Sequence, residues 1–235
     1  MLNRLTDVVK HLLIINVIAY IITLPNHSLF GYDLAVHYPM SPLFHPYQLV
    51  THMFMHGSPM HLFFNMYGLV LLGPPLEARL GSSRFLLFYL ISGFGALLLH
   101  FGVSYYQLSA LSHSIDAETL TEIYDNGAQL VAGGQNYSNP VLGRFNEMLN
   151  GGMLGASGAI FGVLAGFGTM FPRVQLQLLF PPITLTARWF VLIYAGIELY
   201  LGLNGVQQGV AHFAHIGGAL FGFLLLQYWR RTTIL

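Results

Sequence analysis

The sequence predicts an all-α membrane protein, a bundle of six transmembrane helices that forms a single domain over residues 1–235. Composition is the first reason, because 54% of the residues are hydrophobic and only 8% are charged, against about 25% charged in a soluble domain. The second reason is that six stretches approach the 20 or so mostly apolar residues that a helix needs to cross a bilayer. We therefore expect the lipid bilayer to surround most of this chain.

Charge and cysteine content exclude other classes of protein. The formal net charge is zero, so nothing indicates nucleic acid as a partner. The chain has no cysteine, which excludes a disulfide framework and thiol chemistry.

Each of the six stretches is bounded by proline, by basic residues or by a polar segment. The stretches are residues 8–25, 59–76, 85–103, 152–171, 189–204 and 209–229. The first resembles the start of a signal peptide, but no small-residue cleavage site follows it, so we expect a retained anchor. It ends at Pro25, and the second stretch ends at Pro74 and Pro75, where a helix break is tolerated. The third begins directly after Arg84.

The last three stretches have similar boundaries. The fourth lies in an uncharged, glycine-rich run that ends at Pro172. The fifth begins after Arg188, and the sixth is followed by Arg230 and Arg231.

Basic residues predict the direction of the stretches, because Lys and Arg near helix ends are retained on the cytoplasmic side. Eight of the nine fall on one side: Arg4, Lys10, Arg79, Arg84, Arg173, Arg188, Arg230 and Arg231. Arg144 falls on the other side, in a long loop where the rule is weak. We therefore expect both termini in the cytoplasm. Short termini and the lack of a targeting sequence favour a bacterial inner membrane.

A long outer loop over residues 104–151 is more polar than the rest of the chain. Within it, Leu120, Ile123, Tyr124 and Val131 recur at helical spacing, which predicts an amphipathic surface helix. The run NPVLGRFNEMLN later in the loop is a candidate for a second one. We expect this loop to form a solvated or interfacial cap.

Polar residues reach a similar depth on three of the predicted helices. The second, fourth and sixth stretches run from outside to inside, so Asn65, Ser157 and His215 lie roughly 7 to 9 Å below the outer boundary at 1.5 Å per residue. Because polar groups at hydrocarbon depth are costly, a shared water-filled cavity explains them best. His61 shares a face with Asn65, and His212 lies near the face of His215, at the mouth of the cavity.

Glycines predict that the fourth and sixth stretches are in contact. Gly158 opens a row of small residues on the fourth, and Gly218 and Gly222 form another on the sixth, which lets two backbones approach closely. Ser157 is next to the first row and His215 lies one turn above the second. The sequence thus predicts a hydrogen bond between these two side chains.

A serine hydroxyl beside an imidazole is suited to acyl transfer, because the imidazole accepts the hydroxyl proton. No carboxylate lies at matching depth on these three stretches, so we expect a dyad of Ser157 and His215 rather than a triad. His61 and Asn65 are candidate donors to the oxyanion, helped by the Ser157 N–H if a helix begins there. Gly155 and Gly158 are expected to let a substrate backbone come close to the serine.

Three motifs together resemble the rhomboid family of intramembrane serine proteases: HLFFN at 61–65, GASG at 155–158 and AHIGG at 214–218. The resemblance is clearest over residues 44–230. It implies an endopeptidase that hydrolyses peptide bonds in or next to the transmembrane segments of single-span membrane protein substrates. It also implies that Ser157 is the nucleophile, His215 the general base and acid, and His61 and Asn65 the oxyanion donors, without a cofactor or metal. Glu77, in the run EARLGS, is a structural residue by the same resemblance.

Two places depart from the family pattern. The first outer loop often carries a Trp-Arg pair in the family, whereas this chain has Tyr47 and Gln48. Some members stack a tyrosine on the catalytic imidazole, and this chain has Phe161, which can stack but cannot donate a hydrogen bond. Both differences bear on which substrates fit and on how the first loop is held.

Two alternatives from other classes stay open. His52, His56 and His61 cluster before the second stretch and could join His212 and His215 in a metal site of a zinc protease or a metal transporter, although no HExxH motif accompanies them. A non-catalytic rhomboid-like adaptor that binds membrane helices is the other alternative, against which the intact serine and histidine argue.

Two further polar residues are expected to have structural roles. We expect Glu198, in the fifth stretch, to make an interhelical hydrogen bond, and His212 to support the cavity. The sequence does not specify an oligomeric state.

Overall fold

The computed structural model describes residues 5–26, 33–177, 182–206 and 210–232. Arg4 and residue 209, where the last predicted stretch begins, lie outside the described residues. The elements in chain order are α1 (Asp7–Thr23), η2 (Leu24–Asn26), α3 (Gln48–Thr51), η3 (His52–Phe54), α4 (Pro59–Leu80), α5 (Ser82–Ser112), α6 (Ala117–Ala132), α7 (Pro140–Asn150), α8 (Ser157–Met170), β1 (Gln175–Gln177), β2 (Thr184–Thr186), α9 (Ala187–Asn204) and α10 (His212–Arg231).

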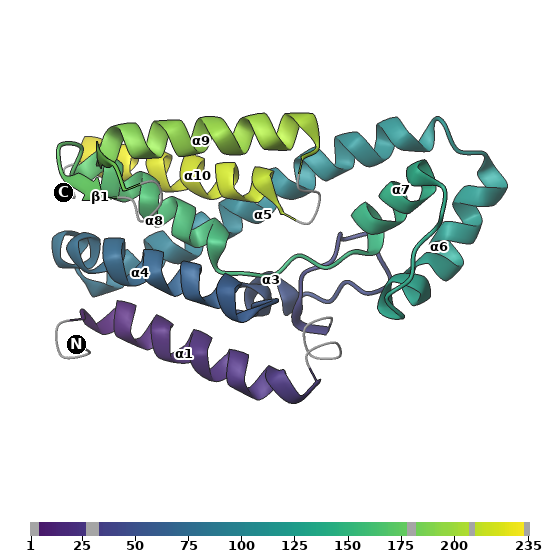
Figure 1. Cartoon of the computed structure of the whole chain (residues 1–235), viewed down its shortest axis with the longest axis horizontal. Helices are drawn as coiled ribbons and strands as arrows, with labels where there is room; N and C mark the ends of the chain where they lie inside the picture. The colour runs from purple at the N-terminus through teal and green to yellow at the C-terminus, as the bar shows by residue number, and fades with distance from the viewer. Residues whose placement is uncertain (1–4, 27–32, 178–181, 207–209, 233–235) are drawn as a thin grey trace.

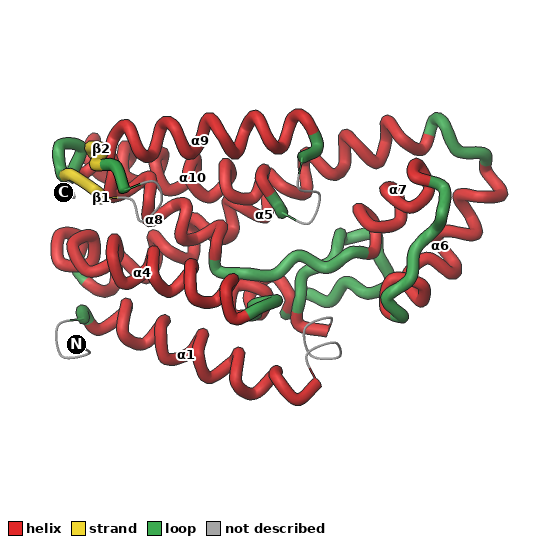
Figure 2. The backbone as a smooth tube through the Cα atoms, in the orientation of Figure 1, coloured by secondary structure: helices red, strands yellow, loops and turns green. Residues whose placement is uncertain are grey.

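The predicted all-α architecture is confirmed within the described residues. Six helices, α1, α4, α5, α8, α9 and α10, overlap the six predicted stretches. The strands described are the two short ones of the antiparallel hairpin β1–β2, in which Gln175 pairs with Thr186 and Gln177 with Thr184. Figure 2 shows how small this hairpin is beside the helices.

The six helices lie side by side along the long axis of the molecule (Figure 1). Helix α1 begins and α10 ends at the same end of this bundle, where the β1–β2 hairpin also lies. Helices α6 and α7 lie at the opposite end. This arrangement puts the predicted basic side and the predicted outer cap at opposite ends of the bundle.

Helix α5 is longer than predicted, because it continues to Ser112 rather than ending at residue 103. Its 31 residues correspond to about 46 Å at helical rise, more than the roughly 30 Å of a hydrocarbon core. By length and hydropathy, α5 is the one described helix that qualifies alone as a membrane span, whereas α8 is apolar but has only 14 residues. Six membrane crossings therefore stay a prediction.

The expected helix break at Pro74 and Pro75 is wrong, because α4 continues through both prolines to Leu80. The helix ends at Gly81, whose φ of 80° belongs to the left-handed region that glycine adopts without a Cβ penalty. The last turn of α4 is held by packing, since Leu76 and Leu80 are buried in the main core.

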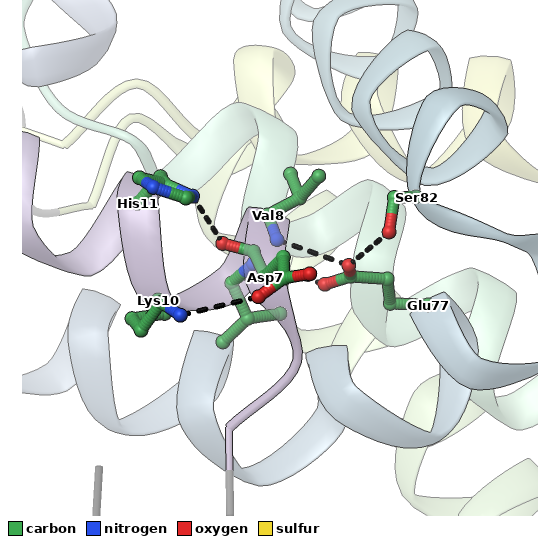
Figure 3. Close-up of polar contacts among 7 residues, drawn as sticks. Asp7, Val8, Lys10, His11, Glu77 and Ser82 are labelled. Atoms are coloured by element: carbon green, nitrogen blue, oxygen red, sulfur yellow. Dashed lines mark hydrogen bonds and ion pairs between the residues drawn. The ribbon is translucent and has the colours of Figure 1, made fainter. Parts of the chain in front are cut away.

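The buried Glu77 joins that last turn to the start of α1. Its Oε1 accepts hydrogen bonds from the Val8 N–H at 3.0 Å and the Ser82 hydroxyl at 2.7 Å, and its Oε2 accepts from the Val9 N–H at 3.0 Å (Figure 3). The first N–H groups of a helix have no partner within that helix. Glu77 thus caps α1, in agreement with the structural role that the resemblance implies.

The outer segment is a helical cap rather than a loop. The predicted amphipathic helices are present as α6 and α7, and they enclose a second hydrophobic core around Ile123, Phe145 and Leu149. Tyr38 from the first outer loop and Leu108 from the extended α5 complete this core. The cap is therefore packed on the end of α5 and on the first loop.

Glycine-mediated contact between α8 and α10 is confirmed. A Cβ added at Gly218 would overlap the Gly158 carbonyl oxygen, and one at Gly222 would lie 2.9 Å from the Gly162 Cα. Ser92 of α5 fills the space beside Gly162. The three helices α5, α8 and α10 thus meet at backbone contact distance.

Candidate active site

Ser157 is the first residue of α8, so the predicted start of this helix at residue 152 is wrong. Residues before it form an extended segment in which Met153 pairs with Val36 of the first outer loop. Gly155 then adopts φ 128°, which an L side chain rarely allows, and its N–H donates to the His52 carbonyl at 2.9 Å. These backbone bonds hold the serine at the N-terminus of the helix.

The predicted contact between Ser157 and His215 is present. The Ser157 Oγ lies 2.9 Å from the His215 Nε2, and both residues are half-buried. Phe161 stacks on the imidazole with ring centroids 4.2 Å apart and planes 4° apart. The serine hydroxyl therefore has a proton acceptor at hydrogen-bond distance, and the imidazole is fixed in orientation by the ring beneath it.

His61 and Asn65 lie on one face of α4 and line the same cavity as Ser157. The Ser58 hydroxyl caps α4 by accepting from the His61 N–H at 3.1 Å, which fixes the first turn. The Gly57 N–H donates to the His61 Nδ1 over a long 3.5 Å, an arrangement that leaves the proton on Nε2. The Asn65 Nδ2 donates to the His61 carbonyl at 2.9 Å and has a second hydrogen to offer.

The glycines beside the serine make room for neighbouring protein groups. A Cβ at Gly155 would lie 2.7 Å from the His61 Nε2, so the missing side chain lets this imidazole approach Ser157. At Gly158 the added atom would overlap Ala96 of α5. The structure thus gives Gly155 a role in placing His61, and the close approach of a substrate backbone stays a prediction.

A buried carboxylate, which the predicted dyad did not include, completes the hydrogen-bonded chain. Glu198 of α9 has its Oε2 2.9 Å from the His215 Nδ1 and 2.7 Å from the His212 Nδ1. The expected interhelical hydrogen bond of Glu198 is confirmed. No carboxylate lies at this depth on α4, α8 or α10, but α9 also reaches this depth, since Glu198 lies six residues before its end at Asn204.

The same cluster holds the ligand atoms that a metal ion could use. One atom each from Glu198, His212 and His215 lie within 4.8 Å of one another. Among the described residues, His52, His56 and His61 do not form one metal-binding group with His212 and His215. His52 instead contacts the Gln48 carbonyl through Nδ1 at 2.8 Å, and His56 lies edge-on to His61 at 5.0 Å.

Burial determines the protonation of the two outer histidines. Loss of solvation is the largest cause that lowers the pKa of His52 to about 4, and the same cause lowers the pKa of His56 to about 4. Both imidazoles are therefore neutral at pH 7 in the folded protein. Burial in the loop interior favours the neutral ring, because removal from water disfavours the charged form.

Gln48 organises the first outer loop, at the position where the family often carries the Trp-Arg pair. Its side chain is fully buried. The Nε2 donates to the Asp33 and Leu43 carbonyls at 3.1 and 2.9 Å, and the Oε1 accepts from the His45 N–H at 3.0 Å. The loop is thus held from within by one amide. Tyr47, by contrast, is half-exposed and stacks on His45.

A cavity of about 1060 Å³ lies over these groups. The polar lining residues His61, Asn65, Ser157 and His215 form what we call its floor. Aromatic lining residues from α4 and α9 form what we call its walls: Phe63, Phe64, Tyr67, Phe190 and Tyr194. A cavity of this size with a few convergent polar groups is a candidate binding site.

Comparison with known proteins matches this chain to one family. A family model described as Rhomboid domain matches residues 44–232. The chain is 31% identical over 176 residues to rhomboid protease AarA of Providencia stuartii, an alignment that covers 74% of this chain and 52% of that protein. It is 32% identical over 180 residues to RHOMBOID-like protein 4 of Arabidopsis thaliana, covering 76% and 33%, and 28% identical over 179 residues to the mitochondrial RHOMBOID-like protein 6 of the same plant, covering 76% and 42%. The chain thus spans about half or less of the length of these relatives.

Proposed function

The chain belongs to the rhomboid family, an integral membrane family, and from that premise we propose that it is an intramembrane serine endopeptidase. It hydrolyses peptide bonds in or next to the transmembrane segments of single-span membrane proteins. The observation that carries the proposal is the 2.9 Å contact between the Ser157 Oγ and the His215 Nε2 at the floor of the cavity.

The proposed reaction is acyl transfer through Ser157. Its Oγ attacks the carbonyl carbon of the scissile bond while the His215 Nε2 accepts the hydroxyl proton. The His215 Nε2–H then gives this proton to the leaving amine, which releases one product and leaves an acyl-enzyme. A water molecule, deprotonated by the same nitrogen, attacks the ester carbonyl. The Nε2–H then returns the proton to the Ser157 Oγ as the acid product leaves, which restores the serine.

The negative oxygen of the tetrahedral intermediate needs donors that are already in place. We propose the His61 Nε2–H, the second Asn65 Nδ2 hydrogen and the Ser157 N–H for this role. In support, the His61 imidazole lies beside Gly155, and the Ser157 N–H belongs to the first turn of α8, where N–H groups are free and the helix dipole is positive.

Water reaches Ser157 from the outer side of the membrane in this proposal. Helix α8 is about 21 Å long at helical rise, shorter than the roughly 30 Å hydrocarbon core, so the cavity above its first residue can hold solvent. We propose a single six-helix domain with both termini in the cytoplasm, as the basic residues predict. A bacterial inner membrane fits the Providencia relative, and the Arabidopsis relatives match over the same share of the chain.

Lateral entry of the substrate is proposed from the cavity walls. Their aromatic side chains come from α4 and α9, two helices that flank the serine. An extended segment that passes between these walls brings its backbone to Ser157.

A cleavage assay with reconstituted protein tests the proposal. The wild type, Ser157→Ala and His215→Ala are incubated with a panel of single-span substrates, and each is treated with a fluorophosphonate probe. We expect labelling and cleavage in the wild type only, because general base catalysis is worth about 10²- to 10⁴-fold and the nucleophile is indispensable. Full cleavage by either variant contradicts the proposal.

The same experiment separates the alternatives. Cleavage that a chelator abolishes, without probe labelling, identifies a metalloenzyme built on the Glu198, His212 and His215 cluster. Binding of membrane helices with neither cleavage nor labelling identifies an adaptor.

A further inference from the structure

We propose that Glu198 is a positioning residue for His215, and that His212 is the counter-ion of this buried carboxylate. The proposed site is then a chain of four side chains from α8, α9 and α10 rather than a serine–histidine dyad. The inference rests on the proposed function for its catalytic consequence, but its structural content is independent of it.

The contacts of His215 require one particular tautomer. Its Nδ1 lies 2.9 Å from the Glu198 Oε2 and its Nε2 lies 2.9 Å from the Ser157 Oγ. A carboxylate can only accept, so Nδ1 carries the proton and donates to it. The Nε2 lone pair then faces the serine hydroxyl, as a general base requires. Without Glu198, the neutral ring could place its proton on either nitrogen.

Glu198 also fixes the direction of the ring. The Nδ1–H···Oε2 bond and the Phe161 ring stacked 4.2 Å away constrain the imidazole along its edge and across its face. When Nε2 becomes protonated during the reaction, the carboxylate stabilises the positive ring, because a hydrogen bond between charged partners is about twice as strong as one between neutral partners.

His212 lies between two hydrogen-bond acceptors. Its Nδ1 lies 2.7 Å from the Glu198 Oε2, and its Nε2 lies 3.1 Å from the Val206 carbonyl oxygen. Both nitrogens face acceptors, so with an ionised Glu198 both carry protons. The side chains of His212 and Glu198 are only 5% and 6% exposed.

A charge pair explains how a carboxylate can stay ionised at this depth. An isolated buried charge is very costly, whereas a pair with its hydrogen bonds satisfied is not. His212 and Glu198 together have no net charge. The His215 Nε2 is left to accept the serine proton.

Glu198→Gln tests the positioning role, with Glu77→Gln as the matched control. Both glutamates are buried and both accept two or more hydrogen bonds, but Glu77 caps α1 at the other end of the bundle. Each variant is reconstituted in full length, and kcat and KM for a transmembrane substrate, the rate of fluorophosphonate labelling and the thermal unfolding temperature are measured. We expect Glu198→Gln to lower kcat and the labelling rate by about tenfold or more while KM changes less than about threefold.

The control separates positioning from folding. We expect Glu77→Gln to lower the unfolding temperature and to leave kcat per folded molecule unchanged. Glu198→Asp, which keeps the charge on a shorter side chain, is expected to recover part of kcat. Equal kcat values in the wild type and Glu198→Gln would overturn the inference, because an amide that merely fills the space would suffice.

Nuclear magnetic resonance of protein with ¹⁵N-labelled histidine provides a readout that does not depend on activity. We expect a far-downfield Nδ1–H proton that disappears in His215→Ala, moves upfield in Glu198→Gln and is unchanged in Glu77→Gln. Both His212 nitrogens are expected at imidazolium shifts. A His215 ring protonated on Nε2 in the resting protein, or a neutral His212, would overturn the assignment.

The resonance experiment also distinguishes the proposed hydrogen bonds from a metal ion bound to the same atoms. Zinc is added to chelator-treated protein. One result would overturn the inference in favour of a metal site: one zinc ion binds per protein with loss of the Nδ1–H signal, and the purified protein already contains this amount of metal. If the wild type neither cleaves nor labels, the proposed function fails, while the Nδ1–H signal still decides the role of Glu198.

Discussion

Substitution of Gly218 by alanine is expected to move His215 on α10 away from Ser157 on α8. Gly218 lies on α10 one turn below His215, and its missing side chain lets α10 rest on the Gly158 carbonyl of α8. Gly158 is the residue after Ser157. The contact between the two helices and the contact between the two reacting side chains are therefore neighbours, and a change in one alters the other.

The expected losses in unfolding free energy and in rate follow from the overlap that the added methyl group creates. The added Cβ would overlap backbone rather than a flexible side chain, so the helices must move apart by about 1 Å or more. Overpacking of this kind costs about 1–3 kcal/mol of unfolding free energy. A misplacement of about 1 Å at a reacting pair can lower the rate about 100-fold. We expect both effects in Gly218→Ala.

The assay compares Gly218→Ala with Gly196→Ala in the same detergent. Gly196 lies within α9 with no atom near its missing Cβ, so alanine there is expected to stabilise the helix by about 0.5–1 kcal/mol and to leave the labelling rate unchanged. Fluorophosphonate labelling reports the reactivity of Ser157, and thermal unfolding reports stability. If Gly218→Ala labels and unfolds like the wild type, the argument from close backbone contact is wrong.

Three further predictions concern other parts of the molecule. Asn65→Ala is expected to lower kcat by about 10²- to 10³-fold with little change in KM, because an oxyanion donor acts in the transition state; an equal loss in binding of a substrate that cannot be cleaved would contradict this. Acidification is expected to destabilise the protein, since burial lowers the pKa of His52 and His56 from 6.5 to about 4. The unfolded chain takes up protons first, so the free energy of unfolding is highest above pH 6.5. It falls toward pH 4, by at most about 3 kcal/mol for each histidine. Denaturant titrations at several pH values measure this slope, and His56→Gln should remove about half of it. Asn150→Ala is expected to cost about 1–3 kcal/mol, because it removes the acceptor of the buried Ser41 hydroxyl and the donor to the buried Asn146 Oδ1. Thermal unfolding should show a loss that the exposed Asn204→Ala does not.

The sequence predicted those features that depend on spacing along one helix. Apolar stretches of about 20 residues, the glycine rows and the depth of Ser157 and His215 are properties of single segments. The six helices and the Ser157–His215 contact are present, although α5 is longer and α8 shorter than predicted. The amphipathic spacing in α6 is equally local. Helix periodicity and rise are the same in every protein, which is why these predictions could be made without homologues.

Features that depend on contacts between segments were missed. Pro74 and Pro75 predict a break by local rules, but packing of Leu76 and Leu80 and the bonds to Glu77 keep α4 helical. Glu198 belongs to a helix that runs in the opposite direction, so its depth must be counted backward from Asn204. The same depth measure applied to that helix would have identified it.

The role of Gly155 could not be read from the chain, because its neighbour is distant in sequence. From the sequence alone, a glycine two residues before Ser157 is compatible with a substrate backbone that lies close to the serine. The structure assigns the space to the His61 imidazole, nearly a hundred residues earlier in the chain. The left-handed φ at this position is also a consequence of the path between two anchored points, the Met153 pairing and the start of α8.

The outer cap explains how that path is held. Between α7 and α8 the chain is bound three times to the first outer loop: the Asn150 carbonyl contacts the His37 Nδ1 at 2.9 Å, Met153 pairs with Val36, and the Gly155 N–H donates to the His52 carbonyl. Each fixed residue removes about 1–2 kcal/mol of backbone freedom, a cost met when the protein folds rather than when the substrate binds. A nucleophile at the end of such a segment is preorganised for reaction. Because the cap packs on both α5 and the first loop, loosening it should lower the reactivity of Ser157 even though no cap residue lines the cavity floor.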